Sequence, residues 1–519
     1  MIPDVSESLF EGNMAPASEV DFEKLSREEA IESGITYFRL FKSAEETVRR
    51  LEKVVATLTN DISTQKQTLL WSQEYLDQLK RLKFGPSSER RMDDGGPLFD
   101  GEALEKEEYE WVKKPKKKRE KFGKTEQKAL PVVEQLYVLS QEEQEKENLR
   151  PMKDQFEESE MIGLTPAKFF LEKSKRQKYC STDATNPRIV TAPGPLKLKE
   201  GSRYSLEFAV EVGIDKYQHH CPIERQVGKM KTDGLIVESQ TLFGQIDTVS
   251  WYLENNVIPV FVAQQKIHKV HLADETPWGN LGKKGNKRFT LWAARNLKCT
   301  LFEIYDSRSQ KVAQNFLKDI QGVLVTDGCS VYKVLFSSKL KLANDWYHVR
   351  RKFIAAEKNF KKEAKFFIRR IRCLSRIERL IKDLPPEERL KIRQERSKKI
   401  VDGIKLKLEE LKSILPESSL GKALSYTQKL WTGLTIFLDD PEVPCHTNDI
   451  EREIRSPVLG RKNHYGSHSL KSAKIGAVWY SVIATCKMHG VDPRAYIIDT
   501  LRRILSKEKI LMPWEWGKI

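Results

Sequence analysis

The chain has 519 residues, enough for three or four domains of ordinary size. Hydrophobic residues make up 39% of it and charged residues 32%, and no apolar stretch is long enough to span a bilayer, which argues against an integral membrane protein. Lys and Arg number 90 against 74 Asp and Glu, a net charge of +16. This excess favours a nucleic-acid partner, because Lys and Arg release counterions from phosphates; the alternative is a protein that is merely basic.

The cysteines and the N-terminus indicate the compartment. Seven cysteines are scattered without a C-x-x-C pair, which argues against a disulfide framework and favours a reducing cytoplasm. Residues 1–10 carry Asp4 and Glu7 and lack a basic region followed by an apolar run, so they do not form a signal peptide.

A heptad pattern follows an acidic segment, residues 1–35, that we expect to be a mobile tail. Six apolar residues fall seven apart: Phe41, Val48, Val55, Ile62, Leu69 and Leu76. Five heptads of this kind predict a coiled coil and therefore a homo-oligomer. The alternative is a single long helix packed on its own chain. Gly85-Pro86 ends the pattern and a charged linker follows.

A pair of helices is predicted next, after short strands such as Val132-Val133 and Arg188-Ile189-Val190. The first helix covers Pro222–Lys231, Gly234 turns the chain, and Ser239 is the expected N-cap of a second helix reaching Leu253. The pattern is typical of a helix-turn-helix, with base-reading candidates early in the second helix. These candidates are Gln240, Thr241 and Gln245. An ordinary helix pair is the alternative.

The pattern changes to strands from residue 266. We expect strands at His268–Thr276, Arg288–Ala294 and Cys299–Tyr305, a helix at Ser309–Ile320, strands at Gly322–Val325 and Leu340–Ala343, and a basic helix from His348. This order predicts a ribonuclease H-like α/β core with a mixed five-stranded sheet. Its first and fourth strands are neighbours, so Asp274 and Asp327 can share a metal. Taken singly, Asp327 could be a turn residue and Asp274 a solvent-facing group at a strand end.

A third carboxylate is expected on a helix that begins near Thr447. On such a helix Glu451 lies on one face with Arg452 and Arg455, which can contact DNA phosphates, while Ile450 and Ile454 pack inward. Glu453 is expected to point away into solvent. The alternative role for Glu451 is a surface ion pair with Arg455.

Several motifs occur in one order across most of residues 75–505. They are Lys83 through Arg90 (KFGPSSER), Ala273 through Pro277 (ADETP), Thr326 through Tyr332 (TDGCSVY), Trp346 through Phe353 (WYHVRRKF), Asn448 through Asn463, Tyr480 through Thr485 (YSVIAT) and Gly490 through Pro493 (GVDP). In these motifs the chain resembles the transposases of the insertion-sequence-66 family. The resemblance implies that Asp274, Asp327 and Glu451 form a DDE triad.

The chain departs from the family in a region that corresponds to residues 140–190. Family members commonly carry two C-x-x-C pairs there, whereas this chain retains only Cys180, with Asp183 where its partner would fall. A four-cysteine zinc site cannot form without those thiolates, so we expect no structural zinc. The predicted division is 1–35 tail, 36–84 coiled coil, 85–130 linker, 131–203 degenerate zinc-finger-like module, 204–262 helical DNA-binding region, 263–353 core, 354–440 helical insertion, 441–490 end of the core with the Glu helix, and 491–519 C-terminal segment.

The expected activity is that of a DDE transposase, which cleaves DNA and transfers strands with two Mg²⁺ or Mn²⁺ ions. Its partner is double-stranded DNA at element ends and target, in the bacterial cytoplasm at the nucleoid, and the family implies small accessory proteins. Residues expected to hold the DNA backbone are Arg452, Arg455, Arg461 and Lys462. The alternatives are an inactive, DNA-binding descendant and a coiled-coil interaction protein.

Overall fold

The computed structural model describes residues 26–84, 138, 140–146, 150, 169–180, 189–282 and 288–516. The predicted linker, 85–130, and the strand expected at Val132-Val133 lie outside these ranges. Within them, no helix combines the length and the apolar character that crossing a membrane requires.

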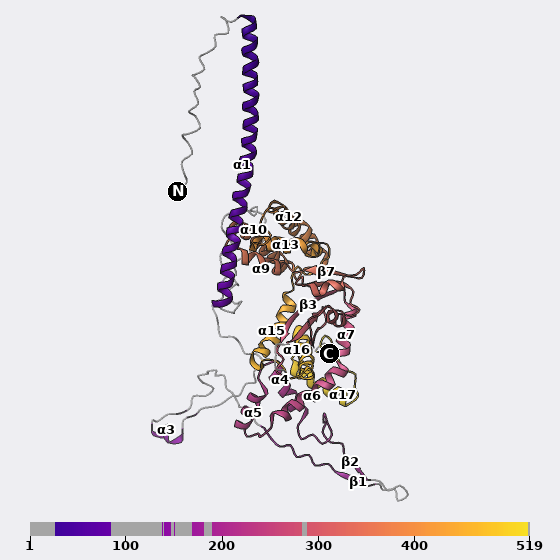
Figure 1. Cartoon of the computed structure of the whole chain (residues 1–519). Helices are drawn as coiled ribbons and strands as arrows, with labels where there is room; N and C mark the ends of the chain where they lie inside the picture. The colour runs from indigo at the N-terminus through magenta and orange to yellow at the C-terminus, as the bar shows by residue number, and fades with distance from the viewer. Residues whose placement is uncertain are drawn as a thin grey trace.

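The N-terminal helix α1, Arg27–Phe84, is 58 residues long, or about 87 Å, and its N-terminal part projects beyond the rest of the molecule (Figure 1). The sequence predicted a mobile tail over residues 1–35, but the helix already begins at Arg27, so residues 27–35 are helical. Ser26 and Glu29 explain the early start, because they form a capping box: the backbone N–H of Ser26 donates to Glu29 Oε2 at 3.0 Å and that of Glu29 to Ser26 Oγ at 3.4 Å.

The heptad residues of α1 are exposed wherever their side chains are described. Phe41 is 67% exposed, Val55 60% and Leu69 71%. The alternative of a helix packed on its own chain therefore finds no support over this stretch. Whether the stripe pairs with a second copy stays a prediction.

The region between α1 and the core contains few regular elements in its described parts. Helix α3 covers Gln141–Lys146, and strands β1, Lys178–Cys180, and β2, Ile189–Thr191, form an antiparallel hairpin. The strand expected at 188–190 thus matches β2. Cys180 is exposed at the end of β1.

Four helices precede the sheet: α4 (Leu206–Tyr217), α5 (Ile223–Thr232), α6 (Ser239–Asn256) and α7 (Ile258–Ile267). The two predicted helices are α5 and α6, but Ser239 is not the N-cap. Glu238 takes that place with an extended backbone and no capping side chain, and Ser239 is the first helical residue. Helix α6 buries Leu242, Ile246 and Val249, one helical face, in the core shared with α4 and α16.

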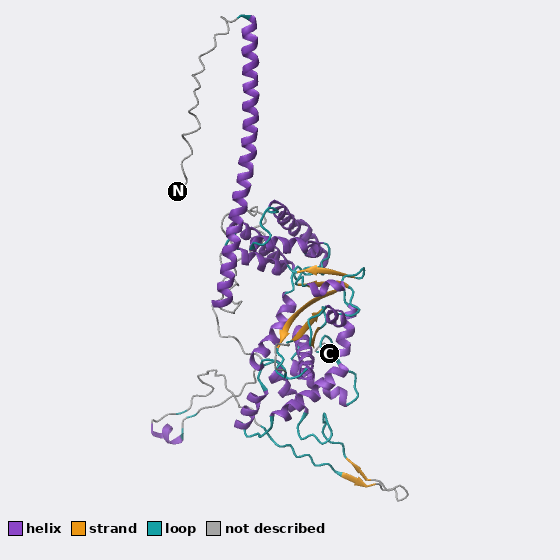
Figure 2. Cartoon of the chain, viewed as in Figure 1, coloured by secondary structure: helices purple, strands orange, loops and turns teal. Residues whose placement is uncertain are grey.

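A five-stranded mixed sheet forms the centre of the molecule (Figure 2). Its strands are β3 (Val270–Trp278), β4 (Phe289–Arg295), β5 (Thr300–Tyr305), β6 (Gly322–Thr326) and β7 (Leu340–Asn344). The spatial order is β5-β4-β3-β6-β7, with β3 antiparallel to β4 and β4 to β5, and with β3, β6 and β7 parallel. The five expected strands are confirmed, and so is the adjacency of the first and fourth.

Helices lie against the sheet and its ends. Helix α16, Leu470–Met488, packs on β5, where Ser481 Oγ accepts from Phe302 N at 2.8 Å and Thr485 Oγ1 from Thr300 N at 3.1 Å. Helices α15, Asn448–His464, and α17, Pro493–Leu505, flank it in the sequence.

The short helix α8, Gln310–Phe316, packs against η3, Ser330–Leu335. The sequence predicted a helix over Ser309–Ile320. Ser309 is its N-cap, with a side chain that accepts from Val312 N, but the helix ends before Ile320. The backbone leaves the helical region at Leu317, and Asp319 takes a positive φ of 64°.

Helices fill the chain between β7 and α15. They are α9 (Trp346–Ala356), α10 (Lys361–Ile381), α11 (Pro386–Ile392), the π-helix η4 (Arg393–Ser397), α12 (Lys398–Glu410), α13 (Ser419–Lys429), α14 (Trp431–Thr435) and η5 (Ile436–Leu438). The buried guanidinium of Arg393 joins them, because it pairs with Glu378 at 2.6 Å and donates to the carbonyls of Phe437 and Asp440 at 2.8 Å.

Candidate active site

Three aspartates occupy matching positions on neighbouring parallel strands: Asp274 lies within β3, and Asp327 and Asp345 directly follow β6 and β7. The β3–β6 register pairs Leu272 with Val325, so Asp274 corresponds to Asp327 two residues further on. The β6–β7 register ends with Thr326 beside Asn344, and the next residues are Asp327 and Asp345. Because adjacent strands lie about 4.8 Å apart, this register aligns the three aspartates across the sheet, with Asp327 between Asp274 and Asp345.

The carboxyl group of Asp274 is surrounded by other acids. Its pKa is raised to about 7, first by burial and then by the negative charges of Glu275, Asp327 and Glu451, against the hydrogen bond from Glu275 N at 2.8 Å. These charges act on Asp274 only because the groups are near it. Asp327 and Glu451 therefore lie in the neighbourhood of Asp274, and the negative charge gathered there favours a cation.

Asp327 is held by a turn immediately after β6. Its Oδ1 accepts from Cys329 N at 2.8 Å, and Tyr426 OH donates to its backbone carbonyl at 2.5 Å. Gly328, between them, has a φ of 85°, and a Cβ there would come within 2.6 Å of Leu430 Cδ1. Asp327 is therefore the turn residue that the alternative proposed, and it also stands beside Asp274.

Glu451 lies in the first turn of α15, and its partners are on α9. Its Oε1 is 2.5 Å from Arg351 Nη2 and 3.8 Å from His348 Nε2. The predicted inward packing of Ile450 and Ile454 is confirmed, since both are buried. The alternative role predicted for Glu451 was an ion pair with Arg455, but its ion pair in the structure is with Arg351.

Asp345 and His348 are site residues that the sequence analysis did not single out. Asp345 is buried at the N-cap of α9, where it accepts from Tyr347 N at 2.6 Å, Thr447 Oγ1 at 2.7 Å and His348 Nδ1 at 2.9 Å. Ligand atoms of Asp345, His348 and Glu451 lie within 4.8 Å of one another, close enough to hold a metal ion. The available signal was an Asp one residue past a strand, as at Asp327, followed by a His three residues later.

The charges within this group depend on one another. Burial opposes the carboxylate of Asp345, but hydrogen bonds from His348, Thr447 and Tyr347 N outweigh it and lower the pKa of Asp345. Burial likewise opposes the imidazolium of His348, but Asp345 and then Glu451 raise its pKa. Opposite charge and hydrogen bonding therefore hold α9 to the start of α15.

Two acids beside the triad have structural partners, and for Glu453 this contradicts the prediction from the sequence. The side chain of Glu453, predicted to be solvated, is 16% exposed and pairs with Arg295 of β4 at 2.8 Å. The side chain of Glu275 is only 1% exposed; it accepts from Arg308 Nε at 2.9 Å and from the hydroxyl of Tyr332. The partners lie far away in the sequence, so local spacing could not reveal them.

The basic residues predicted on α15 divide into exposed and partly buried groups. Arg455 and Lys462 are exposed, and the side chain of Arg452 is 71% exposed beside Asp449 at 3.8 Å. Arg461 is partly buried and donates to Thr276 Oγ1 of β3 at 3.4 Å; burial lowers its pKa, helped by the charge of Arg288. Four cationic side chains thus lie on the helix that carries Glu451.

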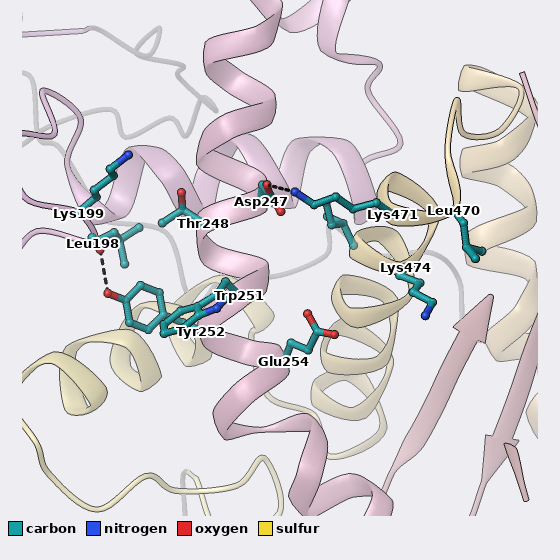
Figure 3. A pocket seen from close by; sticks show the side chains of 11 residues that line it. Leu198, Lys199, Asp247, Thr248, Trp251, Tyr252, Glu254, Leu470, Lys471 and Lys474 are labelled. Carbon is teal, nitrogen blue, oxygen red and sulfur yellow. Dashed lines mark hydrogen bonds and ion pairs between the residues drawn. The ribbon is translucent and has the colours of Figure 1, made fainter. Parts of the chain in front are cut away.

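The candidate base-reading residues are at the start of α6: Gln240 is exposed, and Thr241 and Gln245 are partly exposed. Further along, α6 and the start of α16 border a hollow of about 690 Å³ (Figure 3). Trp251 is 58% exposed there, and Lys471 Nζ pairs with Asp247 Oδ2 at 3.1 Å across it. Its three lysines are nearly balanced by two acids, so the hollow is not strongly basic.

The comparisons with known proteins agree with this architecture. The model of the "Transposase IS66 family" matches residues 201–475, more than half of the chain, and that of the "IS66 C-terminal element" matches residues 481–514. Two uncharacterized proteins of Sinorhizobium fredii are similar. One, y4jD, is 30% identical over 387 residues, which is 69% of this chain and 75% of the relative. The other, y4hP, is 25% identical over 409 residues, or 69% and 70% of the two chains. The chain belongs to the IS66 family of transposases, proteins of DDE-type transposition that insertion sequences encode.

Proposed function

We propose that this transposase cleaves DNA at the ends of its insertion sequence and joins them to a target, on a ribonuclease H-like core, in the bacterial cytoplasm. Asp274, Asp327 and Glu451 are the proposed metal-binding triad. The observation that supports the proposal is the strand register that aligns Asp274 with Asp327, together with the charge of Glu451, which lies near enough to help raise the pKa of Asp274.

The donor atoms of this cluster fit divalent cations. Three carboxylates supply oxygen ligands, which Mg²⁺ and Mn²⁺ prefer. Burial and then neighbouring acids raise the pKa of Asp274, and a cation would neutralise the negative charge of those acids. When bound, two such ions activate an attacking oxygen and stabilise a leaving oxygen.

The chain's own residues then position the DNA. Asp274 and Asp327 would bind metal from rigid strands, and Glu451 would complete the site from α15, whose inward face is buried. The exposed Arg452, Arg455 and Lys462, with Arg461 beside β3, would hold phosphates near the carboxylates. We further propose that α6 contacts the element ends through Gln240, Thr241 and Gln245, and that α1 joins two copies.

The remaining parts of the chain keep the roles inferred from the sequence. We propose that 131–203 correspond to a degenerate zinc-finger-like module, 354–440 to a helical insertion, and 263–353 with 441–490 to the catalytic core. The first assay uses the purified enzyme with DNA and metal, and a second assay adds the small accessory proteins of the same element.

The test uses a duplex that carries the terminal inverted repeats found in DNA flanking the gene. We expect cleavage and joining with Mg²⁺ or Mn²⁺ by the wild type, and loss to background in Asp274→Asn, Asp327→Asn and Glu451→Gln. DNA binding should persist in all three, because Lys and Arg supply most of the affinity.

A matched control is Asp306→Asn, which changes an exposed carboxylate after β5 and should retain activity. Robust cleavage by the Asp327→Asn protein would remove that residue from the mechanism. A wild-type protein that binds the repeats but cuts nothing, with any divalent metal and with the element's accessory proteins added, would favour the DNA-binding alternative.

A further inference from the structure

The metal site beside Glu451 includes a nitrogen donor that a purely carboxylate triad lacks. We propose that His348 Nε2 is a ligand of the divalent ion held by Glu451, and that Asp345 positions the imidazole for this role. The inference rests on the proposed function, because it assumes that Glu451 binds metal.

The first argument is the orientation of the ring. His348 Nδ1 is 2.9 Å from Asp345 Oδ2 and donates to that carboxylate, which leaves the lone pair on Nε2. The edge carrying Nε2 faces Glu451 Oε1 at 3.8 Å. A carboxylate that fixes one imidazole nitrogen while the other faces a ligand site is the common arrangement of metal-binding histidines.

The second argument is the rigidity of Asp345. Its side chain is fully buried, and it also accepts hydrogen bonds from Tyr347 N and from Thr447 Oγ1. Thr447 immediately precedes α15, the helix that carries Glu451. One buried carboxylate therefore fixes both the imidazole and the start of the helix that supplies the neighbouring ligand.

The third argument is distance. Neighbouring ligands of an ion with bonds of about 2.1 Å lie roughly 3 Å apart. The 3.8 Å between His348 Nε2 and Glu451 Oε1 therefore needs a movement of less than about 1 Å, which a small side-chain rotation supplies.

The fourth argument is the charge already present at this oxygen. Arg351 Nη2 lies 2.5 Å from Glu451 Oε1, and the side chain of Arg351 is 49% exposed. A cation thus occupies the place that a divalent ion would take, on a flexible side chain that can turn toward solvent or a DNA phosphate. Metal binding would exchange Arg351 for the ion.

The experiment uses the full-length protein and Mn²⁺ alone. Electron spin-echo envelope modulation detects a ¹⁴N nucleus bound to Mn²⁺, a readout that does not depend on activity. We expect ¹⁴N modulation in the wild type and its loss in His348→Asn, because the Asn amide can still donate to Asp345 but cannot replace Nε2. Mn²⁺ affinity should fall about tenfold or more in that variant, and Mg²⁺ should displace its Mn²⁺ more easily.

The controls separate ligation from folding. His219→Ala removes an exposed histidine and should keep the wild-type modulation and affinity. Asp345→Asn should weaken Mn²⁺ binding about 10- to 100-fold while its ¹⁴N modulation persists at saturating Mn²⁺. Thermal unfolding followed by circular dichroism checks that the variants fold.

Two outcomes overturn the inference and can be told apart. In the first, the protein binds Mn²⁺ and Asp274→Asn weakens this binding, but there is no ¹⁴N modulation and His348→Asn binds Mn²⁺ as the wild type does. This result would exclude His348 as a ligand and leave the carboxylate triad intact. A wild-type protein that binds no Mn²⁺ would overturn this inference and the proposed metal chemistry together.

Discussion

Glu275 shows how a residue next to a proposed ligand can have a purely structural role. It follows Asp274 on β3, so its side chain projects to the other face of the sheet, where it accepts hydrogen bonds from Arg308 and Tyr332. We expect Glu275→Ala to lower the free energy of unfolding by about 1–3 kcal/mol, because the Tyr332 hydroxyl would be left buried without its partner. Urea denaturation measures this change.

The matched control is Glu200→Ala, which removes an exposed carboxylate and should change stability by less than about 0.5 kcal/mol. Equal stability of the two variants would mean that the Glu275 interactions contribute nothing net. The activity of Glu275→Ala should fall only in proportion to the folded protein that is lost.

The sequence identified part of the candidate site for a definite reason. Asp274 and Asp327 follow from strand order, because acids on neighbouring parallel strands meet at one edge. Glu451 needed the family motif, since helical spacing alone equally allowed an ion pair with Arg455. Asp345 had a local signal, its place one residue past a strand with His348 three residues later, but its hydrogen bond from Thr447, 102 residues further along the chain, has none.

Among the elements, α1 exposes an apolar stripe that predicts pairing with a second copy. Val55 and Ile62, 60% and 65% exposed, lie in the middle of the heptad pattern. We expect the double variant Val55→Lys, Ile62→Lys to have a lower mass in sedimentation than the wild type. Each lysine would place a charge in the seam, the contact between the apolar stripes of two α1 helices, at a cost of roughly 2 kcal/mol.

The control for this prediction is Asn60→Lys with Gln67→Lys, which adds the same charges five residues after the seam positions. By the heptad pattern these residues lie opposite the seam, and the oligomer should survive. Identical masses for the wild type and the seam variant would exclude association through α1.

The contact between α4 and α16 depends on a glycine. A Cβ at Gly213 would lie 2.0 Å from Trp479 Cη2, inside the buried core. We expect Gly213→Ala to destabilise the protein by about 1–3 kcal/mol through overpacking. Thermal or urea unfolding measures the effect.

Gly228 of α5 provides the opposite case, since a Cβ there would meet nothing within 4 Å. Gly228→Ala should raise stability by roughly 0.5–1 kcal/mol through helix propensity. A neutral Gly213→Ala would show that Trp479 can move aside without cost.

The elements themselves were predictable where pattern and hydrogen bonding agree. The five strands stand out as apolar or alternating runs, and the order of these runs also predicted the sheet. Helix ends were less accurate: Ser239 suggested a cap that Glu238 provides, and α8 stops at Phe316 although Ile320 keeps the apolar spacing. Backbone geometry at these ends depends on tertiary packing, which local spacing does not describe.

For the whole molecule, a net charge of +16 predicts DNA binding that weakens steeply with salt. We expect the logarithm of the binding constant to fall linearly with the logarithm of salt concentration, measured by fluorescence anisotropy. Changing Arg452, Arg455 or Lys462 to Gln should each reduce the slope by about 1, as loss of one phosphate contact requires.

The control is Lys266→Gln, which removes an exposed cation of α7 that pairs with Asp319 at 3.0 Å. Its slope should match the wild type. If it lowers the slope as much as the α15 variants do, the affinity is spread over the surface and α15 has no special part in holding DNA.

The packing of α16 on β5 also fixes when, during synthesis, the enzyme becomes competent. A growing chain that has reached Lys429 already contains Asp274 and Asp327, but Glu451 and the hydroxyls of Ser481 and Thr485 that bind the β5 backbone have yet to be translated. On the proposed assignment, such a nascent chain can bind DNA through its basic residues but cannot cut it. On this assignment the site is complete only when α15 and α16 have been translated and have packed on the sheet.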